Sequence, residues 1–439
     1  MSHTTSSPEN SNAPWYRGIT GYQWLVLVIA SLGWIFDVFE GQLFNITRGE
    51  MLPDLIRLAH PDMSAEQVAR ESIAWGEKFL GYFLIGGTLG GWFFSSLADK
   101  WGRMPVMALT ILCYSLFSGL TAFATELWHV GTLRFLVAMG VGGEWAVGAA
   151  LVAEVFPKNA RERAGVIFHG SSVLGIWLAA LTGLAVGPHW RIAYLVAIVP
   201  ALLVFWVRMS LKEPESWREA KQKKPAQMGS YRELLGPRWR VRAIGGALLA
   251  MIGLATFWGV AVAGQNIAQD LMRQLKMPPE EIASRAKIAF GLIQPIGAFA
   301  GMLAFGPMSV RMGRKRAFGL MHIAAFFMTL VVCWVPQYFG SYALLVVLLP
   351  VFAFFAQGIH AAYAVYFPEL FPTHLRATGA GFCFNTGRIL AAPVLLWLSP
   401  WMKATLPLSQ AISVLGGLFL IALFILLFLP ETKGQDLPE

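Results

Sequence analysis

The chain has little cysteine and little charge for its length. Three of its 439 residues are cysteine, namely Cys113, Cys333 and Cys383, and each stands inside an apolar segment without metal-ligand or disulfide spacing. Charged residues make up 13% of the sequence, whereas roughly 25% is usual for soluble proteins. The first shortage excludes a disulfide-stapled domain, and the second argues against an ordinary soluble fold.

Motifs of common catalytic sites are also missing from the sequence. It contains no His-Glu zinc pattern, no nucleophile elbow and no phosphate-binding loop. We therefore predict that the protein is not an enzyme and that it uses neither a cofactor nor a metal. The N-terminal stretch MSHTTSSPENSNAP is polar and unbasic, unlike a cleavable signal peptide, so residues 1–21 are predicted to form a disordered cytoplasmic tail.

Apolar runs are what the chain has in abundance. Hydrophobic residues make up 56% of it, and apolar stretches of about 20 residues recur, each long enough to cross about 30 Å of hydrocarbon as a helix. We predict an all-α integral membrane protein with twelve transmembrane helices. The predicted spans are 22–44, 75–97, 104–124, 128–153, 164–186, 190–210, 241–263, 286–306, 317–339, 342–366, 377–400 and 406–430.

Positive charge is distributed unevenly between the two sides of these spans. With the N-terminus in the cytoplasm, about 22 of the 34 Lys and Arg residues fall on the cytoplasmic side and about 10 outside. This bias predicts that both termini are cytoplasmic. It also accounts for the net charge of +9 without a nucleic-acid partner, and it predicts that the basic linker 212–240 is a solvated loop beside anionic lipid.

Two short patterns recur at nearly the same separation. EVFPKNARERAG at Glu154 resembles ELFPTHLRATGA at Glu369, 215 positions later, and DKWGRMP at Asp99 resembles VRMGRKR at Val310, 211 positions later. Two matches at one offset indicate a duplicated six-helix unit. We predict an N-terminal bundle at 22–211, a C-terminal bundle at 241–430 and a cytoplasmic tail at 431–439, with a central cavity between the bundles.

These patterns carry a resemblance to a known family. DKWGR resembles the loop between spans two and three of the major facilitator superfamily, and FPTHLRATGAG, LPETKG and RFLVAMGVGGEW resemble its sugar-porter and metabolite:proton-symporter branches. Two positions depart from the family loop: Ser95 stands where a glycine is usual, and Val310 replaces the aspartate in the second copy. The resemblance implies alternating access by a monomeric functional unit in the plasma (inner) membrane.

The repeated motifs predict a gate at the cytoplasmic mouth. Salt bridges between the bundles would hold this side closed and would break when it opens; the alternative is that these charges are ordinary anchors at helix ends. The predicted gate residues are Asp99, Arg103, Glu154, Arg161, Glu369 and Arg376.

Ionisable residues inside the spans are costly and usually face water or a partner. Asp37 and Arg134 both fall in the outer half of the first bundle, so they are candidates to pair, and the family resemblance implies that such a pair forms the proton site. The alternative is a static ion pair. Glu40 and Glu144 are further proton-coupling candidates, and Glu144 would otherwise contact substrate or join two helices as a protonated acid.

The second bundle offers polar groups for a substrate instead. Arg388 is predicted to lie at mid-depth in the membrane. Its guanidinium group is permanently charged and can donate two parallel hydrogen bonds, so it suits a carboxylate or another anion. The remaining substrate-binding candidates are Asn385, Gln294, Gln357, His360, Trp145 and Trp258. His169 and His322 are predicted to lie near cytoplasmic helix ends, at interfacial positions.

Together these features predict a secondary active transporter, with protons and a small polar or anionic metabolite as its partners. The metabolite is an organic acid, a sugar acid or a sugar. A facilitative uniporter and a multidrug:proton antiporter remain alternatives, although the fifth span lacks the internal Gly-Pro typical of the antiporters. A membrane nutrient sensor on the same scaffold is the alternative from a different class.

Overall fold

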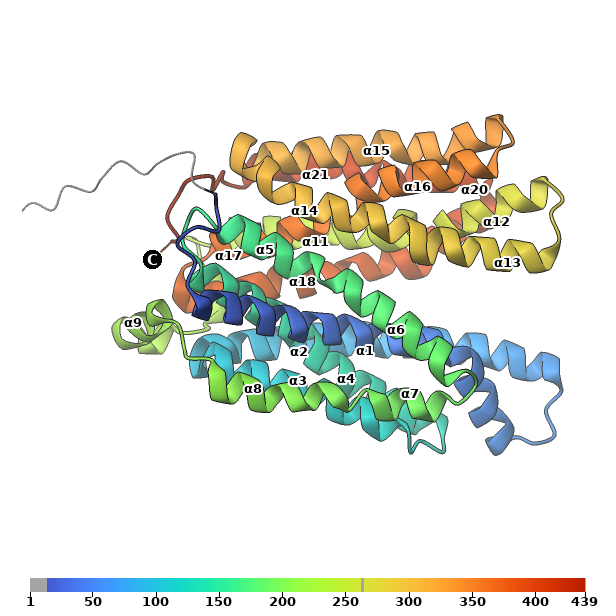
Figure 1. Cartoon of the computed structure of the whole chain (residues 1–439), viewed down its shortest axis with the longest axis horizontal. Coiled ribbons are helices and arrows are strands. Elements are labelled where there is room, and N and C mark those ends of the chain that lie inside the picture. Colours follow the sequence, from blue (N-terminus) through green and yellow to red (C-terminus); the bar gives the residue numbers. More distant parts are fainter. Residues whose placement is uncertain (1–13, 262–263, 439) are drawn as a thin grey trace, which may run out of the picture.

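The structure is a computed structural model that describes residues 14–261 and 264–438, and these segments are helical with short connections. Figure 1 shows two groups of helices, one coloured blue to green and the other yellow to red. Both groups meet at the end of the molecule that carries helix α9 and the C-terminus, and their ribbons diverge toward the other end. We call the first end the terminal end; the sequence predicts that it faces the cytoplasm.

The first group holds the predicted spans one to six. Its helices are α1 (Gly21–Ala59), α2 (Ala65–Trp101), α3 (Arg103–Thr121), α4 (Leu127–Val155), α5 (Arg161–Gly170), α6 (Ser172–Val186), α7 (Trp190–Val196) and α8 (Leu202–Ser210). The fifth span is therefore divided at Ser171, and the sixth consists of two short α-helices around a 3₁₀ turn, η1 (Val199–Ala201).

The linker and the second group follow. The linker carries α9 (Glu215–Lys223), η2 (Pro225–Gln227) and α10 (Tyr231–Leu234). The second group comprises α11 (Arg240–Thr256), η3 (Phe257–Ala261), α12 (Gly264–Gln274), α13 (Pro279–Ile288), η4 (Ala289–Ile293), α14 (Gln294–Met312), α15 (Arg314–Tyr338), α16 (Tyr342–Ala356), α17 (Ile359–Leu370), η5 (Thr373–Leu375), α18 (Arg376–Pro393), η6 (Val394–Leu398), α19 (Ser399–Thr405), α20 (Leu408–Gly416) and α21 (Leu418–Phe428).

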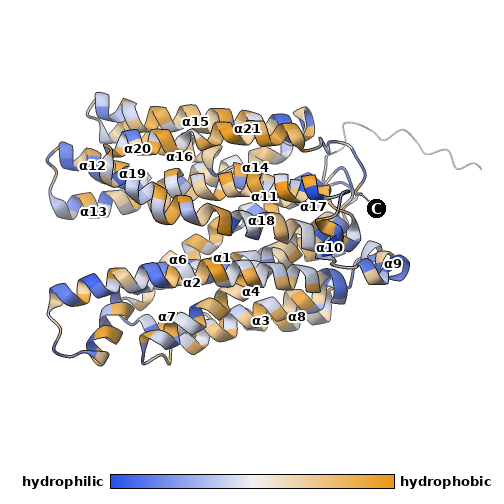
Figure 2. Cartoon of the chain, turned by 180° about the vertical axis from the view of Figure 1, so that it is seen from behind, coloured by the Kyte–Doolittle hydropathy of each residue, from blue (hydrophilic) through white to orange (hydrophobic). Residues whose placement is uncertain are grey.

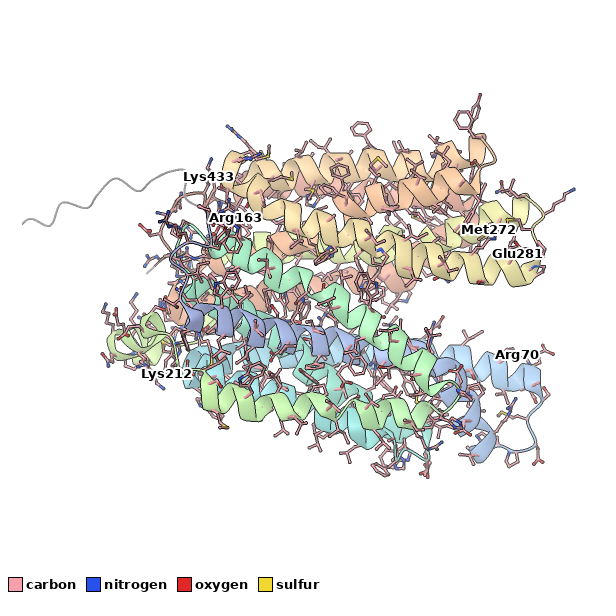
Figure 3. The ribbon with its side chains drawn as sticks, in the orientation of Figure 1. Arg70, Arg163, Lys212, Met272, Glu281 and Lys433 are labelled. Carbon is pink, nitrogen blue, oxygen red and sulfur yellow. The ribbon has the colours of Figure 1, made fainter. Side chains whose placement is uncertain are left out.

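Eleven helices of the described segments are long and apolar enough to cross a membrane, and Trp190–Val204 is a shorter apolar one. Figure 2 shows hydrophobic colour along the middle of the helices and hydrophilic colour toward both ends. Labelled charged side chains lie at these ends as well: Arg163, Lys212 and Lys433 at the terminal end, Arg70 and Glu281 at the other (Figure 3). The distribution is that of an all-α membrane protein, as predicted.

Helices α1 and α2 are much longer than the spans predicted for them. They have 39 and 37 residues, so each rises about 55 Å, well beyond a bilayer core of about 30 Å. The outer loop expected between residues 44 and 75 is therefore mostly helical. Apolar content ends a predicted span, but backbone hydrogen bonding continues into polar sequence, and a capping box between Ser64 and Gln67 starts α2.

Glycines let α4 pass close to its neighbours. A Cβ atom on Gly142 would overlap the backbone of Gly87 in α2, and one on Gly90 would overlap the backbone of Met139. Such close backbone approach replaces the hydrophobic effect as the source of helix packing in lipid. It brings the buried Glu144 of α4 to the centre of the first bundle.

Candidate functional site

A fully buried ion network lies at the terminal end of the molecule. The Arg103 guanidinium donates to both carboxylate oxygens of Glu154, at 3.1 and 2.7 Å, and lies 2.8 Å from Asp99. Its Nη1 also donates to the Ala98 carbonyl at 2.9 Å. These four residues belong to the first bundle, so the network starts within one bundle.

Two further contacts carry this network across to the second bundle. Arg376, at the start of α18, donates to Glu154 at 2.9 Å. Asp99 accepts hydrogen bonds from the backbone N–H groups of Ala377 and Thr378, at 3.2 and 2.8 Å, and from the Thr378 hydroxyl at 2.5 Å. A carboxylate at this position complements the positive end of the helix dipole, so Asp99 of one bundle caps a helix of the other.

A second ion network repeats the first in the other bundle. Arg314 donates to both oxygens of Glu369, at 3.1 and 2.9 Å, and it forms a short contact with Glu162 of the first bundle. The Thr432 hydroxyl donates to Glu369 at 2.5 Å. Arg161, the sixth predicted gate residue, lies close enough to Glu369 and Glu162 to interact with them electrostatically.

Equivalent arginines of the two repeats also donate to equivalent backbone carbonyl groups. Arg161 Nε donates to the Ala153 carbonyl at 2.9 Å, and Arg376 Nε donates to the Pro368 carbonyl at 3.2 Å, each eight residues upstream. This agreement between residues 215 positions apart matches the duplication that the sequence indicates.

Two further glutamates, which the sequence analysis did not single out, cap the N-termini of the helices that begin with Arg103 and Arg314. Glu213 accepts from the backbone N–H groups of Arg103 and Met104, at 2.9 and 2.8 Å, and Glu431 accepts from those of Arg314 and Lys315, at 2.9 and 3.1 Å. Burial raises the pKa of Glu213. At Glu431 burial acts in the same direction, but backbone donors outweigh it and lower the pKa.

The sequence carries a signal for only one of these caps. The Pro-Glu pair in KEPES at Lys212 recurs in LPETK at Leu429, so the repeat points to Glu431, but its counterpart in the first copy is Glu215 and not the capping Glu213. Glu162 gave no such signal, because the residue 215 positions later is Ala377.

Ser95 shows how the chain accommodates its departure from the family loop. Its side chain is fully buried and lies against Gly381 of α18, where an added Cβ would overlap the serine hydroxyl. The glycine that close approach requires therefore stands on the opposite helix, and tight contact between the bundles is preserved.

The linker is docked at the terminal end, which corrects the expectation of a solvated loop. The indole N–H of Trp217, a buried residue of α9, donates to the Asp99 carbonyl at 2.7 Å. Gly229 donates its N–H to the His374 carbonyl at 2.8 Å and accepts from the Ser96 hydroxyl at 2.7 Å. One peptide segment thus bonds to both bundles, which a reading of its charge alone did not predict.

Asp99→Asn is expected to shift the protein toward a state that is open at the terminal end. The substitution keeps the shape but removes the charge that caps α18, and breaking a buried charged contact costs several kcal/mol, so we expect about tenfold or more in the population of the open state. Maleimide labelling of Ser95→Cys, with the three native cysteines replaced by alanine, would report this opening. Glu66→Gln, which changes an exposed carboxylate at the other end, is the matched control; equal labelling in Asp99→Asn and its parent would contradict a latch.

A second group of buried charges lies at mid-depth between the bundles. Asp37 of α1 and Arg388 of α18 belong to opposite bundles, and among the described residues Arg388 is the cation that interacts electrostatically with Asp37. Asp37 Oδ2 and Arg388 Nη1 are both buried without a hydrogen-bond partner. The guanidinium rests against Gly87 and over the Phe384 ring, 5.5 Å from its centroid.

Arg134 is held inside the first bundle instead of by Asp37. Its guanidinium donates to the Glu40 and Gly41 carbonyls at 3.4 and 3.1 Å, and it lies 4.7 and 4.1 Å from the centroids of the Phe44 and Phe83 rings. The expectation that Asp37 pairs with Arg134 is therefore not met in this structure. Two side chains at the same depth in the membrane can still point in different directions, because their helices are rotated differently.

Glu144 joins three helices of the first bundle. One of its oxygens accepts a short hydrogen bond from the Thr110 hydroxyl of α3, and the other points at Gly33 of α1 and has no partner among the described residues. It also interacts electrostatically with Asp37. The contacts of the carboxyl are thus with α3 and α1 of its own bundle.

The predicted aromatic ligand Trp145 is enclosed in this structure. Its ring stacks on Phe384 at 4.4 Å between centroids, and its N–H donates to His169 Nδ1 at 2.9 Å. His169 in turn accepts from Trp34 through its carbonyl, at 3.1 Å. His169 and His322 are both buried within the protein.

The other predicted substrate ligands are scattered. Asn385 is fully buried and donates to the Gly142 and Gly381 carbonyls, at 3.1 and 3.0 Å, so it packs the bundles together. Gln294 donates to the Ala261 carbonyl at 3.1 Å. Gln357 and His360 are buried next to each other at the start of α17, whereas Trp258 is 40% exposed on the molecular surface.

Comparisons with known proteins agree with this architecture. The family model described as Major Facilitator Superfamily matches residues 55–395. A probable 4-methylmuconolactone transporter of Cupriavidus pinatubonensis is 28% identical, covering 96% of this chain and 93% of that protein. The sialic acid transporter NanX of Escherichia coli is 27% identical, covering 87% and 88%.

Among solved structures, the proton:xylose symporter XylE bound to 6-bromo-6-deoxy-D-glucose has the same fold. Its TM-score is 0.75 at 17% identity, and the match covers 95% of this chain and 98% of that one.

Two helical bundles joined by ion networks at one end, with unpartnered charges between them at mid-depth, define a membrane transporter of small metabolites rather than an enzyme. The chain belongs to the major facilitator superfamily. It is a multi-pass protein of the plasma membrane, as its sequence predicts.

Proposed function

We propose that the chain is a proton-coupled symporter of a small carboxylate. The observation that carries this proposal is the electrostatic interaction of Asp37 and Arg388 across the two bundles, each with a buried polar atom that lacks a hydrogen-bond partner among the described residues. An acid and a permanent cation in this arrangement can exchange partners: the cation can bind a substrate anion, and the acid can then bind a proton.

The coupling follows from the charge of the central site. In the empty protein the ionised Asp37 compensates Arg388, because an arginine stays protonated at any ordinary pH. A substrate carboxylate that binds Arg388 replaces this compensation and leaves an uncompensated Asp37. Protonation of Asp37 restores neutrality, so the loaded site carries no net charge when the bundles close around it. Neither substrate nor proton alone achieves this neutrality.

The ion networks at the terminal end would allow this end of the transporter to close and open in turn. The contacts of Asp99 and Glu154 with α18 cross between the bundles, and so do those of Arg103 with the Thr373 carbonyl and of Arg314 with Glu162. We propose that they hold the terminal end closed and break when it opens. The domain limits predicted from the sequence, 22–211, 212–240 and 241–430, are kept in this proposal as the two moving bodies and their linker.

Known relatives support the class of substrate. The names of two relatives specify 4-methylmuconolactone and sialic acid, and sialic acid carries a carboxylate of the kind that Arg388 would bind in two-pronged fashion. The solved structure named as a proton:xylose symporter shares only the fold, so it supports the mechanism less directly than the central charge pair does.

Uptake into proteoliposomes tests the proposal. With the membrane potential clamped at zero, an inside-alkaline pH gradient should drive accumulation of at least one labelled carboxylate from a panel of organic acids, sugar acids and neutral sugars. Substrate entry should also carry protons, which an internal pH dye reports. Downhill equilibration that ignores the pH gradient for every compound would instead identify a uniporter.

A further inference from the structure

A second membrane-embedded acid, Glu40, lies outside the central charge pair. It is three residues after Asp37 on α1 but only 1% exposed, and neither of its carboxylate oxygens accepts a hydrogen bond of good geometry among the described residues. The Ser118 hydroxyl of α3 and Arg134 of α4 lie close enough to interact with it, so it faces the interior of the first bundle. No ion pair within 4 Å holds this buried acid in its ionised form among the described residues.

The charge of Arg134 is balanced mainly by groups that do not titrate. Its donors reach the Glu40 and Gly41 carbonyls, and its faces meet the Phe44 and Phe83 rings, whose negative π surfaces attract a cation. None of these contacts uses the Glu40 carboxylate, so none is lost when that group is protonated. The pocket around Glu40 therefore tolerates both states of the acid.

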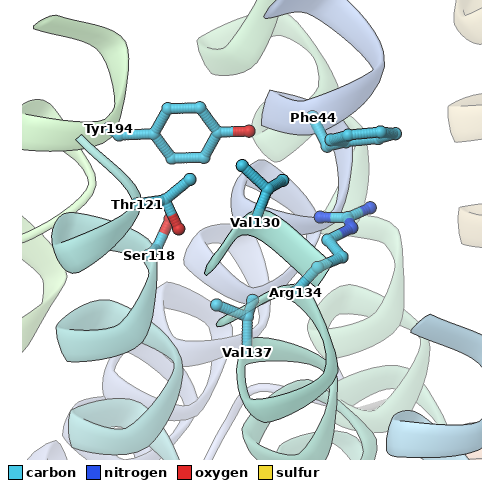
Figure 4. Close-up of a pocket in the computed structure, with 7 residues that line it drawn as sticks. All are labelled: Phe44, Ser118, Thr121, Val130, Arg134, Val137 and Tyr194. Atoms are coloured by element: carbon cyan, nitrogen blue, oxygen red, sulfur yellow. The ribbon is translucent and has the colours of Figure 1, made fainter. Parts of the chain in front are cut away.

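A small cavity lies beside Arg134, toward the end of the molecule opposite the terminal end. Figure 4 shows it between Tyr194, Ser118, Thr121 and Arg134, with Phe44, Val130 and Val137 completing its lining. Its free space is about that of one water molecule. Hydroxyl groups of α3 and α7 line it, and one of them, Ser118, also lies close enough to interact with Glu40, so a water in the cavity can pass a proton toward Glu40 through Ser118.

Few other charged groups face Glu40. Asp37 lies on the same helix, Arg134 on α4, and the phenols of Tyr114 on α3 and Tyr194 on α7 complete the titratable groups that interact with it. Phenols are uncharged near neutral pH. The charge of this compartment therefore depends on Glu40 and Arg134, with Asp37 as the link to the central site.

We propose that Glu40 is a second proton-binding site, filled through the cavity at Arg134, so that two protons accompany each substrate. The inference rests on the proposed symport, in which Asp37 takes the first proton. Each step forms one O–H bond on a carboxylate, with the proton taken from water on one side and returned to water on the other. The two acids interact electrostatically, so a proton on either one lowers the proton affinity of the other, and the two sites do not fill independently.

The ratio of protons to substrate tests the inference. At zero membrane potential and a gradient of one pH unit, two coupled protons support accumulation of about 100-fold and one proton about tenfold. We expect the parent protein to approach the higher limit and Glu40→Gln the lower one, with substrate exchange retained. Glu50→Gln, an exposed acid on the same helix, should behave like the parent.

The outcomes separate this inference from the proposed function. Absence of pH-driven uptake in the parent would remove the symport itself. A parent ratio of one proton per substrate, or a ratio of two that persists in Glu40→Gln, would overturn the second site while leaving symport intact. If Glu40→Gln does not reach the membrane in folded form, Glu40→Met, which keeps the length of the side chain, takes its place.

Discussion

Asp37→Asn is expected to abolish accumulation of substrate against its gradient. The amide cannot ionise, so it neither compensates Arg388 in the empty protein nor carries a proton with the substrate. The loaded site would still be neutral, and the bundles would still close around it. Exchange of labelled for unlabelled substrate across the membrane should therefore persist, while pH-driven accumulation falls to the equilibrium ratio.

Proteoliposomes measure both activities on the same preparation. Asp54→Asn is the matched control, because it makes the same chemical change on the same helix at a partly exposed ion pair with Arg191, which contributes little. Accumulation by Asp37→Asn with the pH dependence of the parent would remove Asp37 from the coupling mechanism. Loss of exchange together with accumulation would instead point to a role in substrate binding.

The membrane architecture could be predicted because it rests on composition along the chain. Apolar runs such as 128–153 predicted α4 to within a few residues, since a bilayer selects for length and hydrophobicity alone. The same reasoning missed the extensions of α1 and α2, which lie beyond the apolar part of each helix. Polar sequence can be helical or irregular, and hydrophobicity does not distinguish the two.

The ion networks at the terminal end were predictable where the duplication repeats and not where it fails. Arg103 and Glu154 recur as Arg314 and Glu369, and the structure gives both pairs the same geometry. Glu162 crosses to the other bundle from a position whose counterpart is Ala377, so no repeat revealed it.

The depth of a side chain in the membrane could be predicted, but the rotation of its helix could not, and this explains why the partner of Asp37 was predicted wrongly. The sequence gives the height of a side chain along its helix, and by height Asp37 suits Arg134. Which face it occupies depends on rotation by about 100° per residue, and helix packing sets that angle. In the structure Asp37 interacts electrostatically with Arg388, and Glu40 with Arg134. The linker was misjudged for a related reason: Trp217, an apolar residue within a basic segment, is the one that anchors it.

Arg388 should determine the preference for anionic substrates. It stands twelve residues after Arg376, the start of α18, or about 18 Å into a membrane about 30 Å thick, too deep for its guanidinium to reach either surface easily. Its Nη1 has no hydrogen-bond partner among the described residues, and the acid that interacts with it electrostatically is Asp37 of the other bundle. A substrate carboxylate is the group that both satisfies this donor and releases Asp37.

Two substitutions separate charge from geometry at this position. Arg388→Lys keeps the charge but loses the two-pronged donor; a charged hydrogen bond contributes about 1.5–3 kcal/mol, so we expect the apparent affinity for a carboxylate to fall about 10- to 100-fold. Arg388→Gln should lose the preference for the anion over its neutral amide or alcohol analogue. Arg273→Gln, at an exposed position of α12, is the control. If Arg388→Gln transports a neutral sugar as well as the parent does, and the parent shows no preference for acids, Arg388 binds no substrate carboxylate and the chain is a sugar porter.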